Sequence, residues 1–231
     1  MTNVLVFSAH PDDAELVVGG VITSISKKHH VSMVYLTDGE TTNSVNERVL
    51  ESANACAELS VSEKMYCGFE NGNISEQTVT QQKKLIEIIR LLKPQVILSP
   101  HYSDSHVDHK EAYRLIKRSR YIAGTSLYPE LGSSYGCKYI YFYAQNPCLD
   151  MGSIFFDVSD VYSSKLKAIK CYKSQFGCGS QTTYVNKVLL EKTFAKDRYH
   201  GSIFGVDYAE ELMYEGKLMI SSIFNCINAG L

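Results

Sequence analysis

The chain has 231 residues, of which 45% are hydrophobic and 21% charged, and its formal net charge at pH 7 is −2. This composition is typical of a soluble globular protein, and the small net charge does not indicate a nucleic-acid partner. No apolar run reaches the roughly 18 residues that indicate a transmembrane helix, so no membrane span is expected. The seven cysteines are an odd number and form no CxxC pair, which favours free thiols in a reducing cytoplasm over a disulfide framework.

Short apolar runs alternate with amphipathic segments through the first half of the chain. The apolar runs predict buried strands over 4–8, 31–36, 64–67 and 96–99. The amphipathic segments predict helices over 14–28, 45–59, 78–92 and 109–121. Strand followed by helix four times over predicts an α/β fold, a Rossmann-like doubly wound and mostly parallel sheet with helices on both faces.

The pattern is less regular after Gly132. Strands are expected over 139–143, 154–157 and 217–224, and helices over 161–172 and 185–196. Neither an internal repeat nor a linker interrupts the chain, so residues 1–231 are interpreted as a single domain.

Two polar loops follow the first and the fourth predicted strands. Their metal-competent side chains are His10, Asp12 and Asp13 in the first loop, and His106, Asp108 and His109 in the second. Ligands of open α/β sheets bind beyond the carboxyl ends of the strands. We therefore expect the functional site where these two loops meet.

The residue types in the loops are suited to a metal centre. The neighbouring carboxylates of Asp12 and Asp13 repel each other unless a positive charge lies beside them. Mixed imidazole and carboxylate ligands with one open position are typical of catalytic zinc, and iron(II) is the alternative in such a site. A remaining carboxylate can accept a proton from water, and a histidine can stabilise an oxyanion or protonate the leaving amine. The loops thus predict metal-assisted amide hydrolysis.

Each loop also has a structural interpretation. Asp13 and Asp108 are suitable N-caps for the helices that follow, and a lone histidine after a strand is commonly a surface residue. The structural interpretation of both loops together is disfavoured, because both reach the edge of the sheet where ligands bind by default.

The same residues resemble the PIG-L/LmbE-like family of N-acetylglucosaminyl deacetylases. Residues 9–13 (AHPDD) are similar to its first motif, and residues 103–109 to its second, which is usually HPDH with an aspartate shortly before. Further similarity at 37–40, Arg48, 68–72 and 93–94 extends the resemblance over most of residues 4–117. In the second half it is thinner and is nearest to the bacillithiol-pathway deacetylases.

The resemblance implies a role for each motif residue. His10, Asp13 and His109 are expected to bind zinc, Asp12 to act as the general base, and His106 to stabilise the oxyanion and act as an acid, with Asp108 tuning and orienting His106. Arg48 is expected to hold the substrate.

Two residues of the second half are also expected to bind substrate. Arg198 and Tyr208 are candidates for contacts with a sugar, because a loop from this half must close the site. His101 is interpreted as a loop residue and not as a fourth ligand, since three protein ligands are usual in catalytic zinc sites.

The expected function is metal-dependent hydrolysis of the N-acetyl amide of an N-acetylglucosamine-type amino sugar or its conjugate, a small-molecule partner. Ser105 stands where relatives often have arginine, which leaves the exact substrate open. The alternatives are another N-acyl substrate, such as an antibiotic or a glycan intermediate, and a non-catalytic sugar-binding module. The resemblance leaves open whether the chain acts alone or as a homo-oligomer.

Overall fold

The first half of the chain alternates strands and helices in the computed structural model, which describes residues 1–39, 45–145, 154–177 and 184–216. The elements are β1 (Asn3–Ser8), α1 (Asp13–Ser26), β2 (His30–Thr37), α2 (Val45–Glu58), β3 (Glu63–Phe69), α3 (Val79–Leu92), β4 (Val96–Pro100) and α4 (Val107–Ala123). The predictions for this half are confirmed, because every expected strand and helix is present near its expected bounds.

The second half contains shorter and less regular elements. They are η1 (Pro129–Leu131), β5 (Tyr139–Tyr143), β6 (Ile154–Asp157), η2 (Ser159–Val161), α5 (Tyr162–Cys171), α6 (Lys173–Phe176), α7 (Tyr184–Phe204) and β7 (Ala209–Leu212). Helix α7 continues to Phe204, well beyond its predicted end. Strand β7 was not predicted, because its sequence AEEL has low strand propensity. The strand expected over 217–224 lies outside the described residues.

The central sheet has five strands in the order β3-β2-β1-β4-β5. All four pairs of neighbouring strands are parallel, which confirms the predicted α/β fold. Strands β6 and β7 form a separate antiparallel pair.

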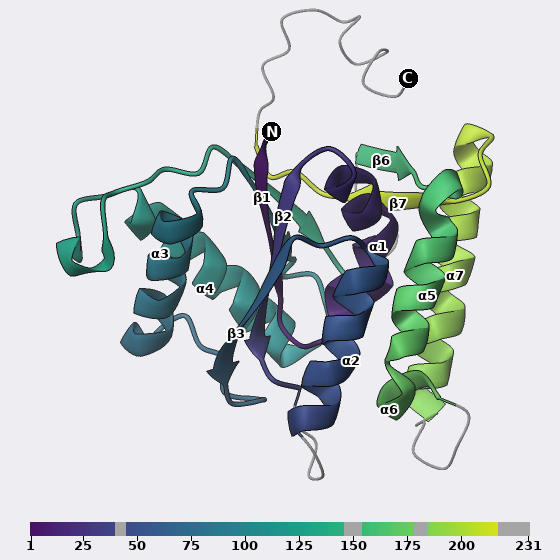
Figure 1. Cartoon of the computed structure of the whole chain (residues 1–231), viewed down its shortest axis with the longest axis horizontal. Coiled ribbons are helices and arrows are strands. Elements are labelled where there is room, and N and C mark those ends of the chain that lie inside the picture. The colour runs from purple at the N-terminus through teal and green to yellow at the C-terminus, as the bar shows by residue number, and fades with distance from the viewer. Residues whose placement is uncertain (40–44, 146–153, 178–183, 217–231) are drawn as a thin grey trace, which may run out of the picture.

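Helices cover both faces of the central sheet (Figure 1). Helices α3 and α4 lie on one face, and α1 and α2 lie on the other, with α5 and α7 packed beyond them. Strand β1 supplies side chains to both cores in alternation, with Val4 and Val6 on the α1 side and Leu5 and Phe7 on the α3 side. In the described part of the chain, no helix combines the length and the hydrophobicity that a membrane span requires.

The strand order reverses between β1 and β4. From β1 the chain moves outward through β2 to β3 and then returns to place β4 on the other side of β1. The helices that leave β1 and β4 therefore lie on opposite faces, and the carboxyl ends of two such strands are where open α/β sheets bind their ligands. The two polar loops follow these same strands, so the topology brings them together.

Candidate metal centre

The first loop is folded so that its two adjacent carboxylates point in different directions. Asp12 is the N-cap residue of α1 and has φ of 110°, in the left-handed region that non-glycine residues rarely adopt. The Asp13 side chain turns back, and its Oδ2 accepts a hydrogen bond from the His10 backbone N–H at 2.8 Å. The Ser8 hydroxyl donates to the His10 carbonyl oxygen at 2.7 Å and fixes the start of the loop.

The second loop presents two histidines at the start of α4. His106 is the N-cap residue, and its Nδ1 accepts a hydrogen bond from the Asp108 backbone N–H at 3.2 Å. The His106 side chain is exposed, whereas His109, less than one turn further, is 3% exposed. The N-caps of α1 and α4 are thus Asp12 and His106, and not Asp13 and Asp108 as the structural interpretation would have it.

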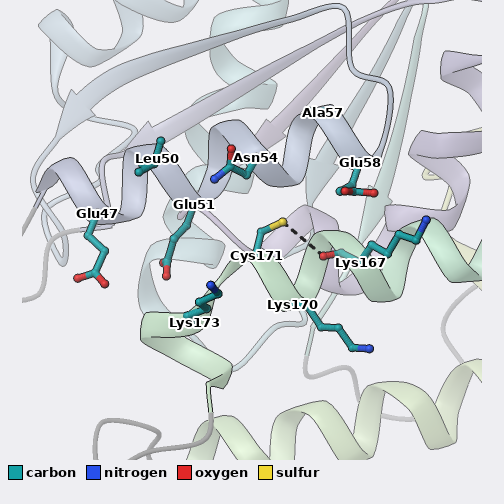
Figure 2. Close-up of a pocket in the computed structure, with 10 residues that line it drawn as sticks. All are labelled: Glu47, Leu50, Glu51, Asn54, Ala57, Glu58, Lys167, Lys170, Cys171 and Lys173. Carbon is teal, nitrogen blue, oxygen red and sulfur yellow. Dashed lines mark hydrogen bonds between the residues drawn. The ribbon is translucent and has the colours of Figure 1, made fainter.

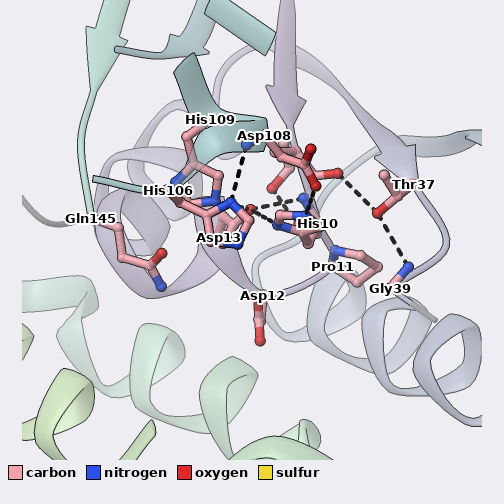
Figure 3. A network of polar contacts seen from close by, with 12 residues as sticks. His10, Pro11, Asp12, Asp13, Thr37, Gly39, His106, Asp108, His109 and Gln145 are labelled. Carbon is pink, nitrogen blue, oxygen red and sulfur yellow. Dashed lines mark hydrogen bonds and ion pairs between the residues drawn. The ribbon is translucent and has the colours of Figure 1, made fainter. Parts of the chain in front are cut away.

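The imidazoles of His10, His106 and His109 form a compact cluster (Figure 3). One nitrogen atom of each ring lies within 4.8 Å of those of the other two, a spacing that can hold a metal ion. Asp13 Oδ2 lies 3.2 Å from His10 Nδ1 and 3.1 Å from His109 Nε2. The three residues that the resemblance assigns to zinc are therefore in mutual contact.

A second carboxylate lies behind the His10 ring and behind the His109 ring. Asp108 Oδ2 is 2.9 Å from His10 Nε2, and Asp104 Oδ2 is 2.9 Å from His109 Nδ1. Each ring thus directs its other nitrogen toward Asp13. Histidines that bind metals are held in this way by an outer carboxylate.

Two features of this arrangement differ from the expectation. The Asp108 carboxylate lies on His10, whereas the resemblance assigned it to His106, which it contacts through its backbone N–H. Asp104 was not among the expected site residues. The signal that could have identified it is an acidic residue in the same polar loop as His106 and His109.

The charges of the cluster favour a cation. Burial is the largest single influence on His10 and His109, and it lowers their pKa values. The charge of Asp13 and the hydrogen bonds to the neighbouring carboxylates together outweigh burial, so the pKa values are raised to about 9 and about 10. Burial opposes ionisation of Asp13 as well, yet the two imidazoles hold its pKa well below the usual range. These groups create a strong local preference for positive charge.

The surroundings of His109 Nε2 indicate whether a metal ion fits the cluster. His109 Nε2 is buried and has no hydrogen-bond partner among the described residues, although Asp13 Oδ2 is nearby. A divalent cation bound by His109 Nε2, His10 Nδ1 and Asp13 would satisfy this nitrogen without a proton. Imidazole nitrogens and a carboxylate oxygen form the mixed donor set that zinc accepts. The residues present therefore fit the metal.

Asp12 pairs with Arg48 instead of with an imidazole. Arg48 Nη2 lies 3.1 Å from Asp12 Oδ2 and donates to the Pro11 carbonyl oxygen at 2.5 Å. Burial raises the pKa of Asp12 to about 6, with Arg48 opposing the shift and Asp13 adding to it. In Figure 3 the Asp12 side chain stands apart from the three rings. Asp12 and Arg48 thus lie together beside the cluster.

The structure does not bring Arg198 and Tyr208 to this cluster. Arg198 pairs with Asp207 at 3.5 Å, and the Tyr208 ring stacks on Tyr162 with 3.7 Å between centroids. Because α7 continues through Arg198, this residue is helical and not part of a closing loop. Strand β7, which begins directly after Tyr208, pairs along its length with β6. His101 pairs with Glu215, in keeping with its interpretation as a loop residue.

A separate groove of about 640 Å³ lies between α2 and α5 (Figure 2). Its α2 wall carries Glu47, Glu51 and Glu58, and its opposite wall carries Lys167, Lys170 and Lys173. The groove lacks the imidazoles that distinguish the cluster at the sheet edge.

Comparisons with known proteins agree with this geometry. Residues 5–119 match the PIG-L family, described as GlcNAc-PI de-N-acetylase. The diacetylchitobiose deacetylase of Thermococcus kodakarensis is 26% identical over 91% of this chain and 82% of its own length. The structure of the conserved protein TT1542 from Thermus thermophilus is similar with a TM-score of 0.85 and 28% identity, covering 96% of this chain and 99% of that one.

The same fold also occurs in a protein with another activity. The 4-carboxy-2-hydroxymuconate hydratase of Pseudomonas putida KT2440 is similar with a TM-score of 0.80 and 20% identity, covering 96% of this chain and all of that one. The fold by itself therefore does not select the reaction, and function has to be argued from the site.

Proposed function

This chain belongs to the PIG-L/LmbE-like deacetylase family, and from that premise we propose that it is a zinc-dependent hydrolase of N-acetylated amino sugars. The reaction splits the N-acetyl amide of an N-acetylglucosamine-type sugar or its conjugate into acetate and a free amine. The observation that carries the proposal is the cluster of imidazoles and carboxylates at the carboxyl ends of β1 and β4. The Thermococcus relative, a diacetylchitobiose deacetylase, supports an amino sugar as the substrate.

Three side chains are assigned to the metal. His10 Nδ1, Asp13 and His109 Nε2 would hold zinc, or iron(II) as the alternative, because both rings are backed by a buried carboxylate. His106 is exposed, and its Nδ1 is bonded to a backbone N–H, so we assign its Nε2 to the substrate. A bound zinc ion would polarise the amide carbonyl and make water nucleophilic at neutral pH.

The remaining groups are assigned to proton transfer and binding. Water attacks the amide carbon and gives a proton to Asp12, whose carboxylate is held by Arg48 at the edge of the cluster. The Nε2–H of His106 donates to the charged oxygen, since its Nδ1 accepts from a backbone N–H and carries no proton to give away. The bond between carbon and nitrogen then breaks, and Asp12 passes the proton that it took from water to the leaving nitrogen. Asp108 supports the donation to the charged oxygen through its backbone contact with His106 and through His10. We assign Arg48 to holding the substrate, because it pairs with Asp12.

A substrate panel combined with metal analysis tests the proposal. Metal content would be quantified in the purified protein. Amine release would be assayed with N-acetylglucosamine, diacetylchitobiose, their nucleotide-linked or glycosidic conjugates, an N-acyl antibiotic and an N-acylated glycan intermediate. We expect release from at least one of the amino sugars or their conjugates by the zinc-loaded protein. If only an N-acyl antibiotic or a glycan intermediate were hydrolysed, the protein would still be a hydrolase, but the proposed substrate would be wrong. Sugar binding without turnover would indicate a binding module.

We further infer that the chain acts as one domain in a reducing cytoplasm. One core cluster contains Val17 and Leu59 from the first half together with Ala168 and Tyr172 from the second, which supports a single folding unit. In the described part of the chain, Cys56, Cys67, Cys137 and Cys171 are free thiols, as is usual in that compartment.

A further inference from the structure

Asp104 lies in the loop between β4 and α4 and is 1% exposed. Its Oδ1 accepts a hydrogen bond from the His106 backbone N–H at 3.0 Å. Its Oδ2 accepts one from the Gln145 backbone N–H at 2.9 Å and lies 2.9 Å from His109 Nδ1. A single buried carboxylate thus joins the N-cap of α4, the segment after β5 and a ring of the metal centre.

The contact with His109 determines which of its nitrogens can bind a metal. When Asp104 accepts the proton of Nδ1, the lone pair of the neutral ring is on Nε2, which lies 3.1 Å from Asp13 Oδ2. The same contact fixes the plane of the ring. A hydrogen bond on one ring nitrogen thereby sets the tautomer at the other.

We propose that Asp104 is a positioning residue of the metal centre, which sets the tautomer and orientation of His109 and holds His106 beside it. This inference rests on the proposed function, because it requires that His109 binds the metal. In the reaction Asp104 touches neither substrate nor metal and acts through the two histidines. Its bond to Gln145 also couples the centre to the segment that follows β5, on the far side of β4 from His10.

Asparagine cannot replace Asp104 without conflict. Both carboxylate oxygens face N–H donors, and an asparagine has only one side-chain oxygen. If that oxygen faces His109 and Gln145, the amide NH₂ faces the His106 N–H, and in the flipped orientation it faces the other two donors. An Asp104→Asn variant keeps the size of the side chain but places donor against donor.

The hydrogen bonds that Asp104 accepts from His106 and Gln145 would also be present if Asp104 only stabilised the fold. The test therefore has to measure the effect of its contact with His109. We would measure the zinc affinity of the metal-free full-length chain by competition with a chromogenic chelator. We would also record the visible spectrum of the cobalt-loaded protein, which reports ligand geometry. Asp104→Asn is expected to weaken zinc binding by about 10- to 100-fold, the usual effect of losing an outer-shell partner, and to change the cobalt spectrum.

Glu51→Gln is the matched control. Glu51 is also buried and also accepts hydrogen bonds from two donors, the N–H and the hydroxyl of Ser174, but it contacts no residue assigned to the metal. It should lose stability without any change in zinc affinity. Equal affinities of the wild-type and Asp104→Asn proteins would overturn the inference while leaving the proposed function standing. Failure of the wild-type chain itself to bind zinc would overturn both.

A measurement on the wild-type protein keeps the inference testable even if Asp104→Asn does not fold. In the ¹H–¹⁵N spectrum of the zinc-loaded chain, His109 should show a protonated Nδ1, slow to exchange with water, and a metal-bound Nε2. The signal would be assigned by its loss in His109→Gln. A metal-bound Nδ1, or an Nδ1 proton that exchanges freely, would contradict the inference.

Discussion

Asp12 and Asp13 are neighbours in the chain, yet their carboxylates face different partners. The left-handed backbone at Asp12 turns one carboxylate toward Arg48 and leaves the other between His10 and His109. A non-glycine residue in this conformation costs of order 1–3 kcal/mol, and such strain is concentrated at functional sites. The strained backbone here keeps the two adjacent carboxylates from facing the same cation.

Asp12→Asn tests this division of roles at the level of one residue. The amide oxygen can still accept from Arg48, but it cannot take a proton from water, so kcat should fall by about 10²- to 10⁴-fold. Zinc affinity should stay close to the wild-type value, because Asp12 is not assigned to the metal. Steady-state kinetics and the chelator competition measure the two effects separately.

Asp13→Asn is the paired variant for this prediction. It removes the charge that lies between the two rings, so zinc binding itself should be lost along with activity. The roles assigned to the two aspartates would be reversed if Asp12→Asn lost the metal and Asp13→Asn retained it.

Helix α1 carries the first loop and contains a break that distant residues repair. Val18 has φ of −127° and ψ of 24°, which are not helical angles. The N–H groups beyond the break, those of Gly20 and Val21, donate to the two oxygens of Glu210 at 2.9 and 2.7 Å. Lys165 Nζ is 2.7 Å from Glu210 Oε1 and donates to the Val17 carbonyl oxygen at 3.4 Å. A buried ion pair thus replaces helical hydrogen bonds.

Lys165→Met should therefore destabilise the chain strongly. It leaves the fully buried carboxylates of Asp197 and Glu210 without their cation, and removing one partner of a buried pair costs about 3–5 kcal/mol. The free energy of unfolding in urea measures the effect. Lys167→Met, an exposed position on the same helix, is the control and should change stability by less than about 0.5 kcal/mol. A loss of similar size in both variants would contradict the role of the pair.

The same elements show how far the sequence can be interpreted. Strands β1, β2 and β4 are buried on both faces, so they are continuous apolar runs and were predicted closely. Strand β7 contains two glutamates, and the burial of Glu210 depends on Lys165 and on the backbone of α1. Partners so far apart in the chain leave no local pattern, so β7 was missed.

The same limit applies to the candidate site. His10, Asp13, His106 and His109 could be predicted to meet, because each follows a strand whose carboxyl end lies at one edge of the sheet. Asp104 was missed because its role depends on which way the His109 ring faces. Arg198 and Tyr208 were expected near the substrate from their chain position alone, and the path of α7 places them elsewhere.

At the scale of the whole molecule, the second half of the chain completes the central sheet and packs against the helices of the first half. The PIG-L match ends at residue 119, yet β5 pairs with β4 beyond it, and α5 packs against α1 and α2. The Tyr172 ring lies 5.4 Å below the Arg48 guanidinium, and its hydroxyl donates to the buried Glu15 carboxylate. The second half therefore supports the side chains around Asp12 without carrying the metal ligands.

The metal centre should also stabilise the molecule as a whole. Its ligands come from loops that follow β1 and β4, which are far apart in the unfolded chain and adjacent only after folding. An ion that binds only the folded state adds about 4 kcal/mol to the free energy of unfolding when its free concentration is a thousand times Kd.

For a chain of this size, that gain in stability corresponds to a rise in Tm of roughly 8–16 °C. Removing zinc with a chelator should lower Tm by this amount, and adding zinc should restore it, as followed by circular dichroism. Asp13→Asn provides the control, since its Tm should not respond to zinc. If zinc did not change the Tm of the wild-type protein, the folded chain would not bind the ion more tightly than the unfolded chain. That result would contradict the proposed zinc centre.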